Sequence, residues 1–119
     1  MDKLQNAKKY DLEERTYNFA KFCRNYANNL PRTSSNCEYA SQLIRSSGSQ
    51  AANYIEANEA LSKKDFQMRV KICRKETKES SLWLRLSEPK TEEDNEKLRL
   101  IQESSELRKI FSSILENSK

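Results

Sequence analysis

The sequence predicts an all-α protein, an antiparallel up-down-up-down four-helix bundle in which residues 1–119 form a single domain. The 119 residues include one glycine and two prolines, too few for the many turns of a β-sandwich or β-barrel. Apolar residues recur at helical spacing along four segments, which short polar connections separate. Short connections make consecutive helices antiparallel, as in a bundle. An extended coiled coil is the weaker alternative, because three breaks interrupt its heptads.

Helices are expected near residues 11–29, 36–60, 63–87 and 91–117. Each opens with a short polar side chain three residues before an acidic one, a pairing that satisfies exposed amide groups at a helix N-terminus. The four pairs are Asp11 and Glu14, Ser35 and Glu38, Ser62 and Asp65, and Thr91 and Asp94. Two prolines, Pro31 and Pro89, lie between segments, where a missing N–H costs least. Residues 1–10 are polar and predict a lead-in that can fray.

One apolar stripe on each helix predicts the core, since a one-sided stripe needs neighbouring helices to cover it. The stripes are Leu12, Phe19, Cys23, Tyr26 and Leu30; Ala40, Leu43, Ile44, Ser47, Ala51, Tyr54 and Ile55; Phe66, Val70, Cys73, Thr77 and Leu84; and Leu98, Ile101, Phe111, Ile114 and Leu115.

The composition argues against an enzyme. There is no histidine, which removes the most common general base and a common zinc ligand. A single glycine leaves no glycine-rich phosphate loop. No catalytic residue, metal or cofactor is therefore expected. A hydrolase that uses carboxylates stays open, although its acids are better explained as helix caps and as i,i+4 partners of lysines; these acids are Asp65, Glu76 and Glu79.

The cysteines and the hydropathy indicate the compartment. Cys23, Cys37 and Cys73 are far apart, which argues against a zinc site, and their odd number fits a reducing compartment. We expect Cys23 and Cys73 to be small buried hydrophobes and Cys37 to be incidental. No run approaches the ~20 apolar residues of a membrane span, and the first residues lack the apolar core of a signal peptide. A soluble, cytoplasmic protein without a membrane partner is expected.

The third helix carries a second pattern, a basic one. Seven cationic residues fall within an arc of about 120° at 100° per residue: Lys63, Lys64, Lys71, Arg74, Lys75, Lys78 and Arg85. Residues 63–78 contain seven basic and two acidic residues, whereas residues 88–97 contain two basic and five acidic ones. Such a band could follow the phosphates of a nucleic acid. The alternative is a solvated helix face that neighbouring acids partly neutralise.

An apolar stripe lies between this basic arc and the core direction of the same helix. It consists of Met68, Ile72, Trp83 and Leu86. Either it packs on an adjacent helix within the bundle, or it forms a contact between subunits, because exposed apolar patches with an aromatic residue often mark interfaces.

The second helix carries a polar stripe at spacings of four, four and three, formed by Arg45, Ser49, Asn53 and Glu56. It is interpreted as an interhelical polar network that fixes the register of the helices, with a ligand or RNA contact as the alternative. Gly48 within the helix costs about 1 kcal/mol relative to alanine, which suggests that another backbone or side chain approaches it closely.

Several short motifs together resemble one known family. They are DLEERT at residues 11–16, FA at 19–20, LPRT at 30–33, QLIRSSGS at 42–49, ANYIEA at 52–57, SKKDF at 62–66, KETKE at 75–79 and WL at 83–84. In this order and spacing they resemble the four helix bundle protein family, also known as the large-subunit ribosomal RNA intervening-sequence proteins. The resemblance covers residues 11–87, about two thirds of the chain, and the last helix matches in length and character only.

The resemblance implies an antiparallel four-helix bundle that assembles into a ring-shaped homo-oligomer, a pentamer. Some members of the family are encoded within sequences that interrupt ribosomal RNA genes. A related branch comprises accessory proteins of diversity-generating retroelements, whose basic ring engages a reverse transcriptase and structured RNA. Catalytic residues are not an established feature of the family. The implied partners are therefore further copies of the chain, structured RNA or a reverse transcriptase.

These observations lead to one functional hypothesis and one rival. The hypothesis is a non-enzymatic, homo-oligomeric, RNA-associated protein that binds RNA through the basic arc of its third helix. The rival is a protein–protein scaffold or accessory subunit, for example of a reverse transcriptase, with no direct RNA contact.

Overall fold

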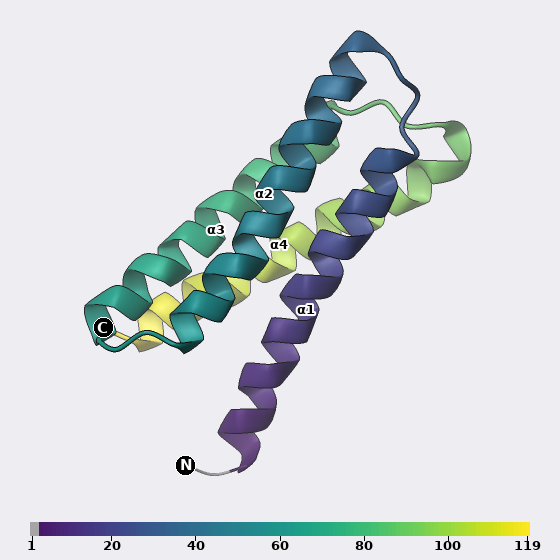
Figure 1. The fold of residues 1–119 in the computed structure, drawn as a ribbon. Helices are drawn as coiled ribbons and strands as arrows, with labels where there is room; N and C mark the ends of the chain where they lie inside the picture. The colour runs from purple at the N-terminus through teal and green to yellow at the C-terminus, as the bar shows by residue number, and fades with distance from the viewer. Residues whose placement is uncertain (1–2) are drawn as a thin grey trace.

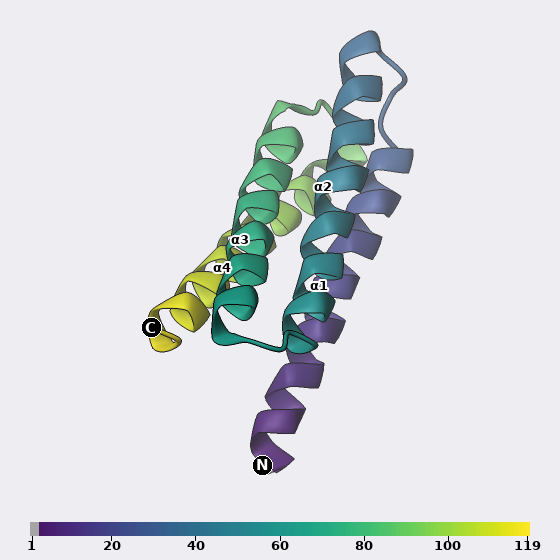
Figure 2. The same ribbon diagram turned by 60° about the vertical axis from the view of Figure 1, so that its left-hand side comes forward.

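The computed structural model describes the backbone of residues 3–119 and the side chains of residues 11–119. It contains four long helices and one short 3₁₀ turn: α1 (Lys3–Asn28), α2 (Ser34–Asn58), α3 (Lys63–Leu86), η1 (Thr91–Glu93) and α4 (Asp94–Asn117). Consecutive helices run in opposite directions and lie side by side (Figures 1 and 2). Within the described residues there is no strand. The predicted all-α four-helix bundle is confirmed.

Three of the four predicted caps, at Asp11, Ser35 and Thr91, are wrong. The helix α1 begins at Lys3, so Asp11 lies inside it and caps nothing. Residues 3–28 contain neither glycine nor proline, and therefore nothing stops the helix before Asp11. Residues 3–10 continue α1 past the ends of the other helices (Figures 1 and 2), while residues 1 and 2 of the predicted lead-in lie outside the described residues. Thr91 opens η1 instead of capping α4, whose N-terminus has no side-chain cap.

The caps that α2 and α3 do have follow from backbone geometry. Ser62 has an extended backbone and its side chain accepts a hydrogen bond from the amide of Asp65 at 3.1 Å, as predicted. At the start of α2 the cap is Thr33 and not Ser35, because the Thr33 hydroxyl accepts from the amide of Asn36 at 3.1 Å. Both caps fix where their helix begins, and hence which residues of α2 and α3 face the core.

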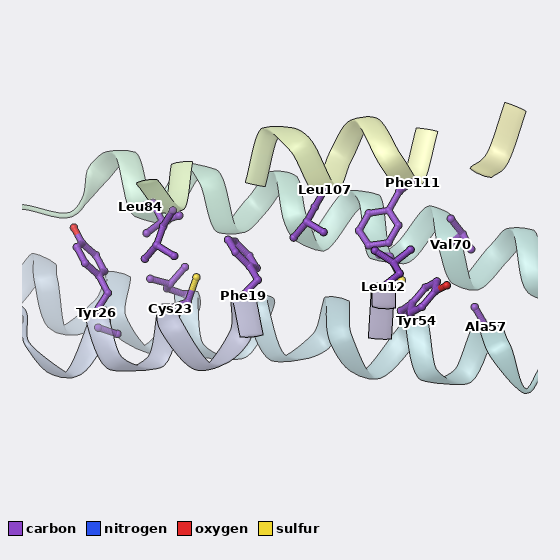
Figure 3. Close-up of a cluster of buried hydrophobic side chains, with 14 of the residues drawn as sticks. Leu12, Phe19, Cys23, Tyr26, Tyr54, Ala57, Val70, Leu84, Leu107 and Phe111 are labelled. Atoms are coloured by element: carbon purple, nitrogen blue, oxygen red, sulfur yellow. The ribbon is translucent and has the colours of Figure 1, made fainter. Parts of the chain in front are cut away.

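The core lies along the axis of the bundle, where side chains from all four helices converge (Figure 3). The stripe predicted on α1 is buried throughout, and so are Leu43, Tyr54, Val70, Cys73, Thr77, Leu84, Phe111 and Leu115. Three predicted core residues are instead exposed: Ile44 by 40%, Ile55 by 49% and Leu98 by 64%. Ile44 and Ile55 each follow a buried residue by one position, which turns them about 100° round the helix and away from its neighbours.

The interior also contains polar side chains that the sequence did not indicate as core: Thr16, Asn36, Ser46, Gln50, Glu76, Ser80, Ser87 and Ser104. Most of them are held by hydrogen bonds between helices or to the backbone. The hydroxyls of Ser46 and Ser80 join α2 to α3 at 2.7 Å. The amide nitrogen of Gln50 donates to the backbone oxygen of Thr16 at 2.7 Å and joins α2 to α1. Such bonds are satisfied in one register of the helices only.

Two connections meet at one end of the bundle. The side-chain amide of Asn36 donates to the backbone oxygens of Pro31, at 3.0 Å, and of Glu88, at 2.9 Å. Nearby, the hydroxyls of Tyr26 and Ser87 share a hydrogen bond of 2.7 Å. The α1–α2 connection is thereby tied to the α3–α4 connection, and the end of α3 that carries the last basic residue is fixed in place.

Candidate nucleic-acid interface

The seven cationic residues predicted on the third helix all lie exposed along the outer side of α3. We call this set the basic face: Lys63, Lys64, Lys71, Arg74, Lys75, Lys78 and Arg85. Among the described residues, no carboxylate forms an ion pair with any of them. Among their side chains, one hydrogen bond to another described residue is present, from the guanidinium of Arg74 to the hydroxyl of Ser112 on α4 at 3.4 Å. The positive charge of the basic face is therefore left facing solvent.

The acidic residues of α3 explain why this charge is not compensated locally. Glu76 is buried and lies 3.5 Å from Arg45 of α2, while Glu79 lies 3.6 Å from the same guanidinium. Both carboxylates point toward α2 and away from the basic face. Asp65 lies in the first turn of α3, where a negative charge favours the helix N-terminus.

The apolar stripe predicted on α3 divides into two parts. Trp83 packs against the core, and its ring stacks on Tyr39 of α2 with centroids 6.1 Å apart. Ile72 is half-buried, whereas Met68 and Leu86 are exposed. Trp83 thus packs within the bundle, while the outer members of the stripe stay uncovered in the single chain.

The polar stripe predicted on α2 faces α3 for most of its length. The side-chain amide of Asn53 donates to the backbone oxygen of Ser49 at 3.0 Å, and Arg69 of α3 donates to the side-chain oxygen of Asn53 at 2.9 Å. Arg45 joins the same seam through the two glutamates of α3. Glu56 is exposed, and its side chain forms no hydrogen bond or ion pair with a described residue.

Sequence reasoning missed the α3 half of this network. Arg69 and Glu76 lie on the side of the α3 helical wheel away from the basic face, which is a signal that the sequence contains. The structure adds that α2 lies on that side. The close approach predicted at Gly48 is wrong within the chain: a Cβ atom placed there would meet nothing within 4 Å.

A second charged region lies between α1 and α4, around a hollow of about 470 Å³. The guanidinium of Arg15 donates to both carboxylate oxygens of Glu103, at 2.8 and 2.7 Å, and to Glu106 at 2.9 Å. These bonds raise the pKa of Arg15 above its ordinary value, while hydrogen bonds from Gln102 and Arg15 lower the pKa of Glu106. Arg99, the second arginine of the lining, pairs with Glu96 at 2.6 Å. Because both arginines are already paired, this hollow offers little to a phosphate.

The described residues contain no candidate metal site. No group of three or more potential His, Cys, Asp or Glu ligands lies together there. Cys23 and Cys73 are buried and Cys37 is exposed, and all three are free thiols. Burial raises the pKa of the Cys73 thiol to about 12 and that of Cys23 further still. No helix in this part of the chain combines the length and the apolar character that crossing a membrane requires.

Fold and surface together define an all-α bundle whose third helix presents an uncompensated basic face. The chain belongs to the 23S rRNA-intervening sequence protein family, whose model matches residues 8–113. This match confirms the resemblance that the motifs of the first three helices indicate, and it extends the likeness through most of α4.

A solved structure shares the fold. It is a protein of unknown function from the S23 ribosomal protein family of Bacteroides thetaiotaomicron, with 26% sequence identity and a TM-score of 0.77. The similarity covers 92% of this chain and 98% of that chain. The comparison with curated proteins gave no match. Neither the family's description nor that of the structural neighbour mentions a catalysed reaction.

Proposed function

We propose that this chain is a non-enzymatic, homo-oligomeric cytoplasmic protein that associates with structured RNA through the basic face of α3. The observation that carries the proposal is the row of seven exposed cations without an ion pair to any described carboxylate. Membership of a family described by an intervening sequence of 23S rRNA supports the choice of RNA as the polyanion. The free thiols fit a reducing compartment.

The geometry suits a phosphate backbone better than a small anion. The basic face extends from Lys63 to Arg85, about 33 Å at 1.5 Å per residue. Cations spread over this length can contact several phosphates at once, and each contact releases a counterion from the RNA. Several copies in one assembly would multiply both the electrostatic field of a single chain and the number of phosphate contacts.

An exposed face of α2 supports the homo-oligomeric part of the proposal. Ile44 and Ile55 lie about three turns apart on one side of the helix and are exposed. Gly48 lies between them with open space in front of it. A flat apolar surface of this kind permits close approach of another helix, and uncovered apolar patches often mark contacts between proteins.

The test of RNA binding is fluorescence anisotropy with a labelled RNA hairpin across a salt series. The affinity of the wild-type protein should fall by about 0.7 to 0.9 log units per tenfold rise in salt for each phosphate contacted. A variant with Lys71→Glu, Lys75→Glu and Lys78→Glu should bind far more weakly and lose about 2 units of that slope.

The control variant makes the same change in net charge elsewhere on the surface. Its substitutions are Lys21→Glu, Lys90→Glu and Lys109→Glu, all at exposed positions off α3. It should keep most of the affinity, because binding depends on where the cations lie and not on net charge alone. Equal loss of affinity in both variants would refute the assignment to the basic face. No binding by the wild type at low salt would refute RNA association and leave the rival, a protein–protein scaffold.

A further inference from the structure

An apolar strip runs beside the basic face, and RNA binding does not explain it. The strip consists of Met68, Ile72, Leu82, Trp83 and Leu86. Three of these side chains are well exposed, Met68 by 45%, Leu82 by 44% and Leu86 by 43%. Leu82 was not part of the stripe that the sequence indicates, yet it completes the exposed end of the strip. Phosphates and sugars gain nothing from contact with such side chains, so their exposure needs another explanation.

The strip and the basic face share one surface. A shallow depression of about 660 Å³ on α3 is lined by two apolar residues, three lysines, one acid and two uncharged polar residues: Met68 and Ile72; Lys64, Lys71 and Lys75; Asp65; and Ser62 and Gln67. The three lysines outnumber the single carboxylate, so the lining is net positive. None of these three lysines forms an ion pair with a described carboxylate. An apolar floor between free ammonium groups is complementary to a ligand that has both apolar and acidic side chains.

The length and shape of the strip select a helix as that ligand. Met68 and Leu86 are separated by about 27 Å along α3, which matches about 18 residues of a second helix. The apolar side chains form two groups, Met68 with Ile72 and Leu82 with Trp83 and Leu86, and residues 73–81 between them include Lys75 and Glu79. A docked helix would therefore contact apolar side chains near its two ends. Amphipathic helices dock on apolar grooves through side chains spaced at i, i+3, i+4 and i+7. Methionine side chains adapt readily to such partners, because the thioether is flexible and polarizable.

We infer that the apolar strip and the adjoining lysines dock an acidic amphipathic helix of a partner protein, in competition with RNA. The apolar face of that helix covers Met68, Leu82 and Leu86, and its carboxylates pair with Lys64, Lys71 and Lys75. Only the element of competition rests on the proposed function, since the two ligands use the same lysines. A partner rich in acidic residues would then release RNA from the basic face.

The chain provides its own reporter for this contact, because Trp83 is its one tryptophan and belongs to the strip. The probe is a synthetic peptide of about 18 residues without aromatic residues, with leucines at helical spacing and glutamates on the flanks. As this peptide is added to the protein, the fluorescence emission of Trp83 should change until the docking site is saturated. A peptide of the same composition, scrambled so that the leucines surround the helix, should bind at least about tenfold more weakly, since it presents no apolar face.

Two variants separate peptide binding from RNA binding. Met68→Ser with Leu86→Ser should weaken the peptide about tenfold, because burial of both side chains is lost, while RNA affinity changes by less than about twofold. Lys71→Gln with Lys75→Gln should weaken both ligands. The matched control is Leu98→Ser, which removes an exposed leucine of α4 outside the strip and should change neither affinity. When the peptide is added to a complex of the protein with labelled RNA, the fluorescence anisotropy of the label should fall, because the peptide displaces the RNA.

Each alternative result has a distinct meaning. Equal binding of the designed and scrambled peptides, or no effect of Met68→Ser with Leu86→Ser on the peptide, would overturn the inference while RNA binding stands. Peptide binding with no RNA binding would support the docking site and refute the proposed function. If the serine variant instead lowers the molecular mass of the protein's own assembly, the strip is a contact between copies and the inference is wrong.

Discussion

The three cysteines differ in how far they are buried. Cys23 and Cys73 lie in the core, where desolvation disfavours the thiolate and raises the pKa of each thiol. Cys37 lies exposed near the start of α2. The expectation that Cys23 and Cys73 are small core residues is confirmed by their burial. Their reactivity should differ accordingly, since the thiolate is the nucleophile.

Thiol labelling gives a direct measure of this difference. Native protein treated with iodoacetamide at pH 8 should gain one adduct, at Cys37, and protein unfolded in guanidinium should gain three, one at each free cysteine. Mass spectrometry of the intact chain counts the adducts. The Cys37→Ser variant should gain none in the native state. Rapid native labelling of Cys23 or Cys73 would contradict the packing of the core.

The same raised pKa values predict a loss of stability in alkali. In the unfolded chain the thiols ionise near pH 8.5, whereas in the folded chain the pKa of Cys73 is about 12 and that of Cys23 is higher. Above pH 8.5 the unfolded state therefore binds fewer protons, and the free energy of unfolding falls as the pH rises toward 12. Urea midpoints at pH 7.5 and pH 9.5 should show this decrease. An unchanged midpoint would mean that both thiols ionise in the folded protein.

At the scale of whole helices, the seam between α2 and α3 combines an exposed arginine with a buried acid. One oxygen of Glu76 faces the Arg45 guanidinium at 3.5 Å, while the other is buried without a hydrogen-bond partner among the described residues. A buried carboxylate carries a desolvation cost that its partner offsets only in part. Removing Arg45 should therefore lower the stability of the protein, whereas removing the charge of Glu76 should leave it unchanged or raise it.

A double-mutant cycle tests this asymmetry. Arg45→Ala should lower the free energy of unfolding by about 1–3 kcal/mol, because it leaves Glu76 buried without its cation. Glu76→Gln should be neutral or stabilising, and adding Arg45→Ala to it should cost less than about 0.5 kcal/mol. Urea unfolding at neutral pH measures all four proteins. Additive effects of the two substitutions would show that the pair does not interact.

Helix starts show where local signals succeed and where they fail. The motif at Ser62 predicts its cap correctly because the chain before it leaves α2 and has an extended backbone at Ser62. The similar motif at Asp11 fails because helix-forming residues precede it without a break, and α1 continues through it. A capping motif therefore predicts a helix start only when the residues before it do not themselves favour a helix.

For the whole molecule, periodicity along single helices is enough to predict the bundle and the position of the basic face. Both depend on the direction in which each side chain points about the axis of its own helix. The spacing of residues in the sequence determines that direction. Contacts between helices are different. The ion pairs depend on which helices are neighbours and on their register. Examples are the pair of Arg45 with Glu76 and the pair of Arg15 with Glu103. The sequence of each helix alone does not contain that information.

Gly48 tests how copies of the chain assemble. A Cβ atom at this position meets open space in the single chain, so Gly48→Ala should stabilise the helix by about 0.5–1 kcal/mol. Gly48→Arg should also fold, but its long side chain projects from the face between Ile44 and Ile55. If copies pack through that face, sedimentation velocity should show wild type and Gly48→Ala at a multiple of the 14.0 kDa chain mass and Gly48→Arg at a lower mass. Because an oligomer is linked to protein concentration, the thermal midpoint of wild type should rise with concentration and that of Gly48→Arg should not. Assembly of Gly48→Arg like that of wild type would exclude this face of α2 as the contact between copies.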